Sequence, residues 1–396
     1  MDNIFILSNS PGEVAGWVKP VAAALTAKKS EAKVTLVLLP CPYASGMEER
    51  YGREIAGIDE SVMFKQIWSR GAPKSGKRIV LQLGGDPFFG ALLAARFRAK
   101  WMIYTARPRW CSRVDHYFLP DLKAVQRFKD KGVSAAKYSF VGNLMIDSVP
   151  ICGSRSEMKA RFGVPENENV VSFLPGSRPF EYQDGYAFFT KAAMALLSRV
   201  ENMNAFLPVA PTVEEGLLED GLRRAGIEWR GLSNAEEIVW NGPGRIRLIR
   251  SGNYEAIKAS KLAVALPGTN NLQIASLGVP LMMVAPLNEA ENIPLDGLPG
   301  IIPMSLPGAK ILKKKLVFWY SSKERYVSLP NRIAGKIIVP EHRGIMTPEM
   351  VADMAEELLL SPERLKNITD GYAYIPFVRG AADKIASVVC ESLERI

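Results

Sequence analysis

Short apolar segments recur along the chain and alternate with stretches that have helical spacing. The run 281–285, for example, is apolar throughout and does not alternate with polar residues, which is typical of strands buried on both faces of a parallel sheet. Stretches such as 18–28 and 213–225 lie between them and predict helices. We therefore expect an α/β fold with doubly wound, parallel sheets. The predicted strands are 3–8, 34–39, 79–83, 101–104, 117–119, 170–174, 205–209, 246–249, 262–266 and 281–285.

The series of strands is interrupted near residue 150. A chain of 396 residues is too long for one ordinary core. Residues 150–156 are typical of a linker, and a new set of strands begins at 170. We predict a Rossmann-like domain over 1–150, a second Rossmann-like domain over 151–375, and a C-terminal helix over 376–396. The helix has one apolar face, which packs either on its own domain or on the first one.

Composition narrows the function classes. No run of 18 apolar residues is present, and the first residues do not resemble a secretion signal, so we expect a cytosolic protein. Four scattered cysteines and two histidines argue against a disulfide framework and against a zinc site. The net charge of +9 indicates an acidic partner, which is nucleic acid, an anionic lipid surface or a phosphorylated substrate.

Two loops at predicted strand ends suit an anion. In the Leu-Pro-Gly-Ser-Arg motif at 174–178, a glycine allows close approach, a serine offers a hydroxyl and an arginine binds oxyanions. The stretch 262–280 predicts a strand, a polar loop and a helix whose first N–H groups face that loop. Together the loops predict a diphosphate site that needs no metal. Its candidate residues are Gly176, Ser177, Arg178, Gly268, Thr269 and Asn270.

Two carboxylates are candidates for a general base. Asp86 follows the strand 79–83 in a Gly-Gly-Asp-Pro turn, which favours an exposed position. The alternative is that Asp86 caps the following helix. Glu13 lies after the first strand, and its alternative role is a structural contact with loop N–H groups. On the sequence alone we prefer Asp86.

Two basic segments contain large aromatic residues. The segment 96–113 has six cations and no acid, and 310–320 places a lysine cluster beside apolar residues. Cations beside Trp and Phe suit the surface of an anionic membrane. Stacking on nucleic-acid bases and a simple solvated surface are the alternatives. We favour a membrane or lipid-phosphate contact that includes Arg107, Arg109 and Trp110, and we expect no nucleic-acid partner.

Five motifs follow one another along this chain in the order in which they occur in the lipid A disaccharide synthase family, which the chain therefore resembles. The most specific is Tyr-Val-Ser-Leu-Pro-Asn-Arg-Ile-Ala-Gly at 326–335. The others are Gly-Glu-x-x-Gly at 12–16, Val-Gly-Asn-Leu-Met-Ile-Asp-Ser-Val at 141–149, Leu-Pro-Gly-Ser-Arg at 174–178 and Gly-Thr-x-x-Leu at 268–272.

The resemblance implies a GT-B architecture, with two Rossmann-like domains facing across a cleft. It also implies an inverting, metal-independent transfer of an acylated glucosamine from UDP to a lipid monosaccharide phosphate at the inner membrane. The UDP-sugar is the donor substrate, and no cofactor is expected. The oligomeric state stays open between a monomer and a homodimer.

The resemblance also assigns roles to matching residues. It places Gly176, Ser177, Arg178, Gly268 and Thr269 on the UDP diphosphate, with Asn331 and Gly335 nearby. It places Gly12, Glu13 and Gly16 on the acceptor side. The chain departs from the family pattern at three positions: Gln273 replaces a ribose-binding glutamate, Trp17 an acidic residue, and Asn143 a histidine.

Two other functions remain open at this stage. A UDP-N-acetylglucosamine 2-epimerase shares the GT-B layout and its phosphate loops, but it normally carries more carboxylates and histidines. A protein that binds a nucleotide sugar or a lipid phosphate without turnover would accommodate the departures at Trp17, Asn143 and Gln273.

Overall fold

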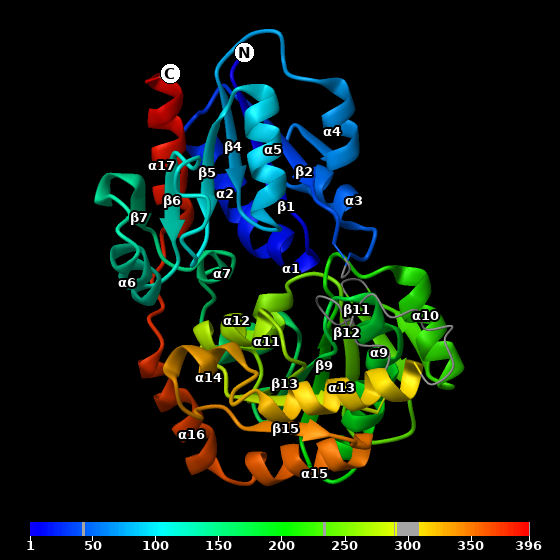
Figure 1. The fold of residues 1–396 in the computed structure, drawn as a ribbon. Coiled ribbons are helices and arrows are strands. Elements are labelled where there is room, and N and C mark those ends of the chain that lie inside the picture. The colour runs from blue at the N-terminus through cyan, green and yellow to red at the C-terminus, as the bar shows by residue number, and fades with distance from the viewer. Residues whose placement is uncertain (42–43, 233–234, 289, 291–308, 396) are drawn as a thin grey trace. The chain divides into compact units, whose positions relative to one another are not determined.

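The chain forms two compact units, shown in Figure 1. The computed structural model describes residues 1–41, 44–232, 235–288, 290 and 309–395. The first unit comprises Met1–Ser148 together with Phe377–Ile396, and the second comprises Val149–Pro376. The C-terminal segment therefore belongs to the first unit.

The first unit is built on a seven-stranded sheet in which all neighbouring strands are parallel. Its spatial order is β3-β2-β1-β4-β5-β6-β7. The chain crosses from one side of β1 to the other, as in a doubly wound sheet. The strands are β1 (Asn3–Ser8), β2 (Lys33–Leu38), β3 (Glu60–Met63), β4 (Arg78–Gln82), β5 (Lys100–Tyr104), β6 (His116–Leu119) and β7 (Tyr138–Phe140).

Helices cover both faces of this sheet, because alternate residues of each strand point to opposite sides. Ile4 and Ile6 of β1 pack into the core that includes α2 and α17, whereas Phe5 and Leu7 pack into the core that includes α5. The helical elements are α1 (Pro11–Glu13), η1 (Val14–Val18), α2 (Lys19–Ala27), α3 (Glu48–Glu54), α4 (Phe64–Arg70), α5 (Pro87–Phe97), α6 (Leu122–Asp130), η2 (Ala135–Lys137), α7 (Leu144–Asp147) and α17 (Ala381–Glu394).

Helix α17 packs beside α2 through its apolar face (Figure 1). Ile385, Val389 and Leu393 are buried on that face. The Asp147 carboxylate accepts hydrogen bonds from the backbone N–H groups of Gly380 and Ala382, at 2.8 and 2.7 Å. These bonds hold the start of α17 on the first unit, because a carboxylate satisfies N–H groups that lack a partner within the helix.

The second unit contains a mixed sheet of eight strands in the order β10-β11-β12-β9-β8-β13-β14-β15. The strands β12, β9, β8, β13, β14 and β15 are joined by parallel pairings, whereas β11 pairs antiparallel with both β10 and β12, so the sheet is mixed at one end. The strands are β8 (Asn169–Leu174), β9 (Met203–Pro208), β10 (Glu228–Gly231), β11 (Ala235–Val239), β12 (Ile246–Ile249), β13 (Leu262–Ala265), β14 (Leu281–Pro286) and β15 (Glu341–Gly344).

The helices of the second unit lie around this sheet (Figure 1). They are α8 (Arg155–Arg161), α9 (Pro179–Leu197), α10 (Glu215–Arg224), α11 (Asn253–Lys258), α12 (Asn270–Ser276), α13 (Ala309–Lys323), α14 (Leu329–Ala334), α15 (Pro348–Leu359), α16 (Pro362–Gly371) and the short η5 (Tyr372–Tyr374). Among the described residues, none of the helices has both the length and the apolar character needed to cross a membrane.

The chain is helical soon after β1. Residues 11–18 form α1 and the π-helical turn η1. The Ser10 side chain accepts a hydrogen bond from the backbone N–H of Glu13, and Pro11 occupies the first helical turn. A serine cap followed by proline is a helix start signal, and it places Glu13 on a rigid turn.

Candidate functional site

A glutamate and a glycine meet at the carboxyl edge of the first sheet. Strands β1 and β4 are parallel neighbours, so the segments that follow them emerge side by side. Glu13 comes from the turn after β1, and Gly84 follows β4. A Cβ atom on Gly84 would lie 1.9 Å from Glu13 Oε2. Only glycine leaves room for the carboxylate at this position.

The environment of Glu13 favours its neutral form. Burial raises the pKa of Glu13 to about 7, although the N–H groups of Ser10 and Asn9 and the Ser8 hydroxyl lower it. Desolvation disfavours the charged carboxylate, and the nearby donors only partly compensate. A carboxyl group that titrates near neutral pH is suited to general base catalysis.

Several polar atoms near Glu13 are unsatisfied. Within the described part of the chain, Glu13 Oε2, Asn9 Oδ1 and Trp17 Nε1 are buried without a hydrogen-bond partner. Such groups are costly and rare in native proteins, and they indicate a bound water or a ligand. Glu13 directly precedes the turn η1 and Trp17 lies within it, and π-helical turns are frequent at functional sites. We therefore place the candidate site of the first unit here.

The predicted glycines of this motif line the same turn. Gly12 is partly buried in α1, and Gly16 is buried in η1. The ring of Trp17 packs edge-on against Tyr104, with the ring centroids 5.4 Å apart. The Tyr104 hydroxyl donates to the carbonyl of Gly142 and accepts from the N–H of Leu144. The aromatic ring of Trp17 therefore lies along one side of the polar atoms around Glu13 and packs against Tyr104.

Asp86 makes the contacts of a helix cap. Its Oδ1 accepts a hydrogen bond from the backbone N–H of Phe88 at 2.8 Å, at the start of α5. The side chain of Asp86 is exposed, whereas the Glu13 carboxylate is buried. These contacts are those of the capping role that the sequence offers as the alternative for Asp86, and which of the two carboxylates acts as a base stays a prediction.

The predicted cationic residues follow β5, at the same edge of the first sheet. Arg107, Arg109 and Trp110 are exposed. Trp110 has a positive φ of 59° and packs edge-on against the buried Trp101. The carbonyl of Arg109 accepts a hydrogen bond from the Tyr117 hydroxyl at 2.5 Å. The loop is therefore fixed by its backbone, while both guanidinium groups extend into solvent.

The two predicted diphosphate loops lie side by side in the second unit. Strands β8 and β13 are parallel neighbours, with Ala265 opposite Leu174. The N–H of Leu266 donates to the carbonyl of Leu174 at 3.2 Å. The loops that begin at Pro175 and Pro267 therefore leave the same edge of the sheet together.

A carboxylate already occupies the first loop. The backbone N–H groups of Ser177 and Arg178 both donate to Glu181 Oε2, each at 3.2 Å, and the Arg178 guanidinium contacts Glu181 Oε1 at 3.1 Å. Gly176 has a φ of +90°, and a Cβ there would lie 2.3 Å from Glu181 Oε2. Burial raises the pKa of Glu181, against the lowering effect of Arg178. The loop has the geometry of an anion site, and Glu181 fills it.

Glu181 is a residue that motif reading missed. It stands three positions after Arg178, at the third residue of α9, where an acidic side chain commonly bonds back to the start of the helix. This spacing was the signal that could have identified it.

The second loop is organised by amide side chains. Thr269 precedes α12 and makes no side-chain cap. Asn270 Oδ1 accepts from Asn271 Nδ2, which also donates to the carbonyl of Leu266. Gly268 lies against Asn270, since a Cβ there would be 3.0 Å from Asn270 Oδ1. The predicted ribose ligand Gln273 donates from Nε2 to the Tyr254 hydroxyl at 2.8 Å.

Asn331 has a structural environment. It is fully buried, its Oδ1 accepts from the N–H groups of Ile338 and Val339, and its Nδ2 donates to the carbonyl of Val339 and to Glu341. Glu341 also accepts hydrogen bonds from Ser328. These contacts leave Asn331 no free polar group, so they favour a structural role over the predicted nucleotide contact. Gly335 ends α14 with a φ of +72°.

No metal centre is apparent in the described ranges: three or more His, Cys, Asp or Glu side chains do not gather there as ligands would. The metal-free, cofactor-free reaction expected from the sequence stays a prediction.

Known proteins resemble this chain in sequence. Residues 118–290 match the family model described as lipid-A-disaccharide synthetase. The lipid-A-disaccharide synthase of Syntrophus aciditrophicus is 29% identical over 252 residues, which cover 63% of this chain and 56% of that protein. This chain is a relative of the lipid-A-disaccharide synthases. The family resemblance read from the motifs is confirmed.

A second relative gives the same result. The lipid-A-disaccharide synthase of Pseudomonas aeruginosa (strain UCBPP-PA14) is 27% identical over 221 residues, which cover 56% of this chain and 48% of that protein. The chain thus spans about half the length of the curated synthases that it matches.

Solved structures resemble the chain in fold. The S. aureus MnaA–UDP co-structure has a TM-score of 0.54 at 13% identity and covers 100% of this chain and 98% of that one. The UDP-GlcNAc 2-epimerase of Neisseria meningitidis bound to UDP-GlcNAc has a TM-score of 0.53 at 12% identity, with 100% of both chains covered. At such identities the likeness shows the fold alone, and it confirms the predicted α/β fold of GT-B type.

Proposed function

We propose that this relative of the lipid-A-disaccharide synthases is a glycosyltransferase of the same type. In this reaction an acylated glucosamine moves from UDP to a lipid monosaccharide phosphate, with inversion at the sugar carbon. The family match and the names of the curated relatives support the class of reaction. The environment of Glu13 supports the mechanism.

Glu13 is the proposed general base. In an inverting transfer, the acceptor hydroxyl gives up its proton as its oxygen bonds to the sugar carbon, and the bond from that carbon to UDP breaks. The Glu13 carboxylate has a pKa of about 7 and a buried, unpaired Oε2, so it can accept that proton near neutral pH. Gly84 leaves the space in which the carboxylate is held.

The donor is proposed to bind at the two adjacent loops of the second unit. The departing UDP carries a growing negative charge, which oriented N–H groups and a guanidinium stabilise. Arg178 supplies the positive charge, and the N–H groups of Ser177 and Arg178 supply the donors. Because Glu181 holds those N–H groups, a diphosphate must displace its carboxylate to reach them. One fold neighbour was solved with UDP and another with UDP-GlcNAc, which supports this choice of donor.

The acceptor is a lipid, so we propose that the protein works in the cytosol at the inner membrane surface. Helix α13 carries an exposed stripe of Ile311, Lys315, Trp319 and Lys323, each one turn after the last. Val317 on the opposite side is buried against Leu287 and Ala290. An amphipathic face with cations and a tryptophan suits the headgroups of an anionic bilayer.

A 2-epimerase acting on UDP-GlcNAc is the second candidate, because two solved epimerases have this fold. Both the family model and the curated relatives favour the transferase instead. A binding protein without turnover is the third candidate, because Trp17, Asn143 and Gln273 depart from the family pattern.

One assay separates the three. The purified chain is incubated with acylated UDP-glucosamine, with and without a lipid A monosaccharide phosphate acceptor, and with UDP-GlcNAc. A transferase releases UDP only when the acceptor is present. An epimerase converts UDP-GlcNAc into its 2-epimer without acceptor. A binding protein shows thermal stabilisation by the ligand and no product, which contradicts the proposal.

A further inference from the structure

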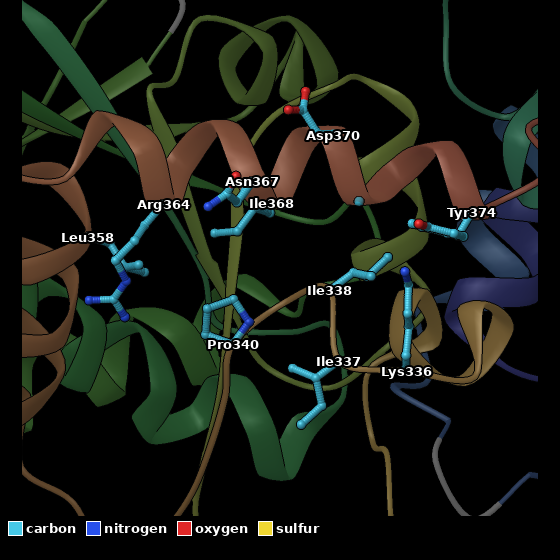
Figure 2. A pocket seen from close by; sticks show the side chains of 11 residues that line it. Lys336, Ile337, Ile338, Pro340, Leu358, Arg364, Asn367, Ile368, Asp370 and Tyr374 are labelled. Atoms are coloured by element: carbon cyan, nitrogen blue, oxygen red, sulfur yellow. The ribbon is translucent and has the colours of Figure 1, made fainter.

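A groove lies on the second unit, away from the predicted diphosphate loops. It has a volume of about 590 Å³ and runs between α16 and the segment 336–340 (Figure 2). This volume falls within the range of small-molecule sites, roughly 300–1,000 Å³. The segment 336–340 precedes β15, whereas the diphosphate loops follow β8 and β13. Since these strands are parallel, the groove lies at the opposite edge of the sheet.

The floor of the groove is apolar and rigid. Ile338, Leu358 and Ile368 contribute to the lining and are themselves buried in the core. Helix α16 approaches this floor closely at Gly371, where a Cβ would lie 2.9 Å from Ile338 Cβ. Ile337 adds an apolar side chain that is 71% exposed. Hydrocarbon placed here would leave water on one side and contact packed side chains on the other.

Cations stand at both ends of this floor. Figure 2 shows Arg364 beside Leu358 at one end and Lys336 beside Tyr374 at the other. Arg364 contacts Glu357 at 2.5 Å on the open surface, and exposed pairs of this kind are weak and exchange readily. Lys336 Nζ lies 3.0 Å from the centre of the Tyr374 ring. The acidic residue of the lining, Asp370, is paired with Lys366 at 3.1 Å.

We propose that this groove binds a single-chain anionic amphiphile, with its alkyl chain along the apolar floor and its phosphate at a terminal cation. The charge of the two lining cations is complementary to a phosphate, and the floor between them is complementary to a chain. The proposed transfer reaction does not use this groove, so the inference goes beyond that function.

The test is titration calorimetry of the full chain with decyl phosphate below its micelle concentration. We expect saturable binding of one molecule per chain. The double variant Lys336→Gln/Arg364→Gln is expected to bind about tenfold more weakly or worse, because it removes the cations at both ends of the groove, one of which contacts the phosphate. Ile337→Ser is expected to weaken binding about threefold, since it removes exposed contact area.

Matched controls make the result specific. Lys191→Gln/Arg332→Gln removes two positive charges from exposed positions of the same unit outside the lining, and we expect it to bind like the wild type. Inorganic phosphate is expected to bind about a hundredfold more weakly, because it cannot use the apolar floor. Thermal unfolding checks that each variant is folded.

Three results would overturn the proposal: no saturable binding of decyl phosphate, equal losses in Lys191→Gln/Arg332→Gln and in the groove variant, or equal affinities for inorganic and decyl phosphate. No UDP-sugar is present in this test. A failure here would therefore leave the proposed transfer reaction untouched, and a failed transfer assay would leave the groove untouched.

Discussion

Each unit places a glutamate over a glycine at the carboxyl edge of its sheet, yet the two glutamates differ in their hydrogen bonds. In the first unit, the carboxylate of Glu13 lies where a Cβ of Gly84 would be. In the second unit, the carboxylate of Glu181 lies where a Cβ of Gly176 would be. Burial raises the pKa of both. Glu181 accepts hydrogen bonds from two N–H groups and from Arg178, whereas Glu13 Oε2 has no partner among the described residues.

This difference separates a group that holds the fold from a group that is available for chemistry. A buried hydrogen-bond acceptor without a partner destabilises the folded state, unless a ligand or a water molecule supplies the missing hydrogen bond. A satisfied carboxylate instead fixes the loop around it. By the same comparison, the polar atoms of Asn331 are satisfied within the fold, whereas Glu13 Oε2 has no partner among the described residues.

The largest expected effect comes from removing the unpaired carboxylate. Glu13→Gln keeps the shape of the side chain but cannot accept a proton, so we expect turnover to fall about 10²- to 10⁴-fold. Steady-state release of UDP in the presence of lipid acceptor measures it. Glu48→Gln is the control, because Glu48 is also buried in the first unit but already accepts hydrogen bonds from Ser45 and Gly46. Equal rates in wild type and Glu13→Gln would rule out Glu13 as the base.

The fold was largely predictable from the sequence, because most residues of the buried strands are apolar. The segments at 3–8 and 246–249 coincide with β1 and β12. The strands that were missed, such as β15 and β10, are short and polar and lie at sheet edges, where burial does not select apolar residues.

The candidate site was only partly predictable. Motif reading found the loops and Glu13, because glycines and charged residues at strand ends are visible in the sequence. It preferred Asp86 over Glu13, because sequence spacing does not show which carboxylate becomes buried. It also assigned Asn331 to the nucleotide, although the bonds to Val339 and Glu341 that occupy it form only in the folded chain.

In the second unit, we expect a large loss of stability when the hydrogen-bond network around Asn331 is broken. Asn331→Ala would leave the N–H groups of Ile338 and Val339 and part of Glu341 without a partner in the core. We expect the free energy of unfolding to fall by about 3 kcal/mol. Denaturant titration measures this change. Asn367→Ala, at an exposed position of α16, is the control for replacing an asparagine with alanine. An unchanged midpoint together with weaker UDP binding would restore the predicted nucleotide contact.

The anion loop itself is tested at Arg178. Arg178→Ala removes a charged donor, so we expect UDP affinity to fall by about 1.5 to 3 kcal/mol. Calorimetry with UDP measures it, and Arg178→Lys is expected to recover part of the loss by restoring the charge. Arg199→Ala, which breaks a surface pair with Asp353 in the same unit, is the control. If Arg178→Ala binds UDP like the wild type, the donor site is not at this loop.

The pH dependence of stability tests the raised pKa of Glu13. Its folded-state pKa of about 7 is above the value of 4.5 expected in the unfolded chain, so the folded state holds this proton more tightly. The resulting stabilisation is present below pH 4.5 and is lost as pH rises through 7. We expect the free energy of unfolding to fall by about 2 kcal/mol more in the wild type than in Glu13→Gln between pH 5 and 8. Parallel curves for the two proteins would contradict the raised pKa.

The smallest expected effect is at Asp86, which brings the comparison back to the first unit. Because the Asp86 carboxylate caps α5 through the N–H of Phe88, Asp86→Ala removes a helix cap and nothing else that chemistry needs. We expect a loss of about 1 kcal/mol in the free energy of unfolding, with turnover unchanged. Asp86→Ser, which keeps a capping oxygen, is expected to recover that stability. A fall in turnover comparable to that of Glu13→Gln, in a variant that remains folded, would transfer the role of base to Asp86. It would also show that an unpaired buried carboxylate is not by itself the mark of the reactive group.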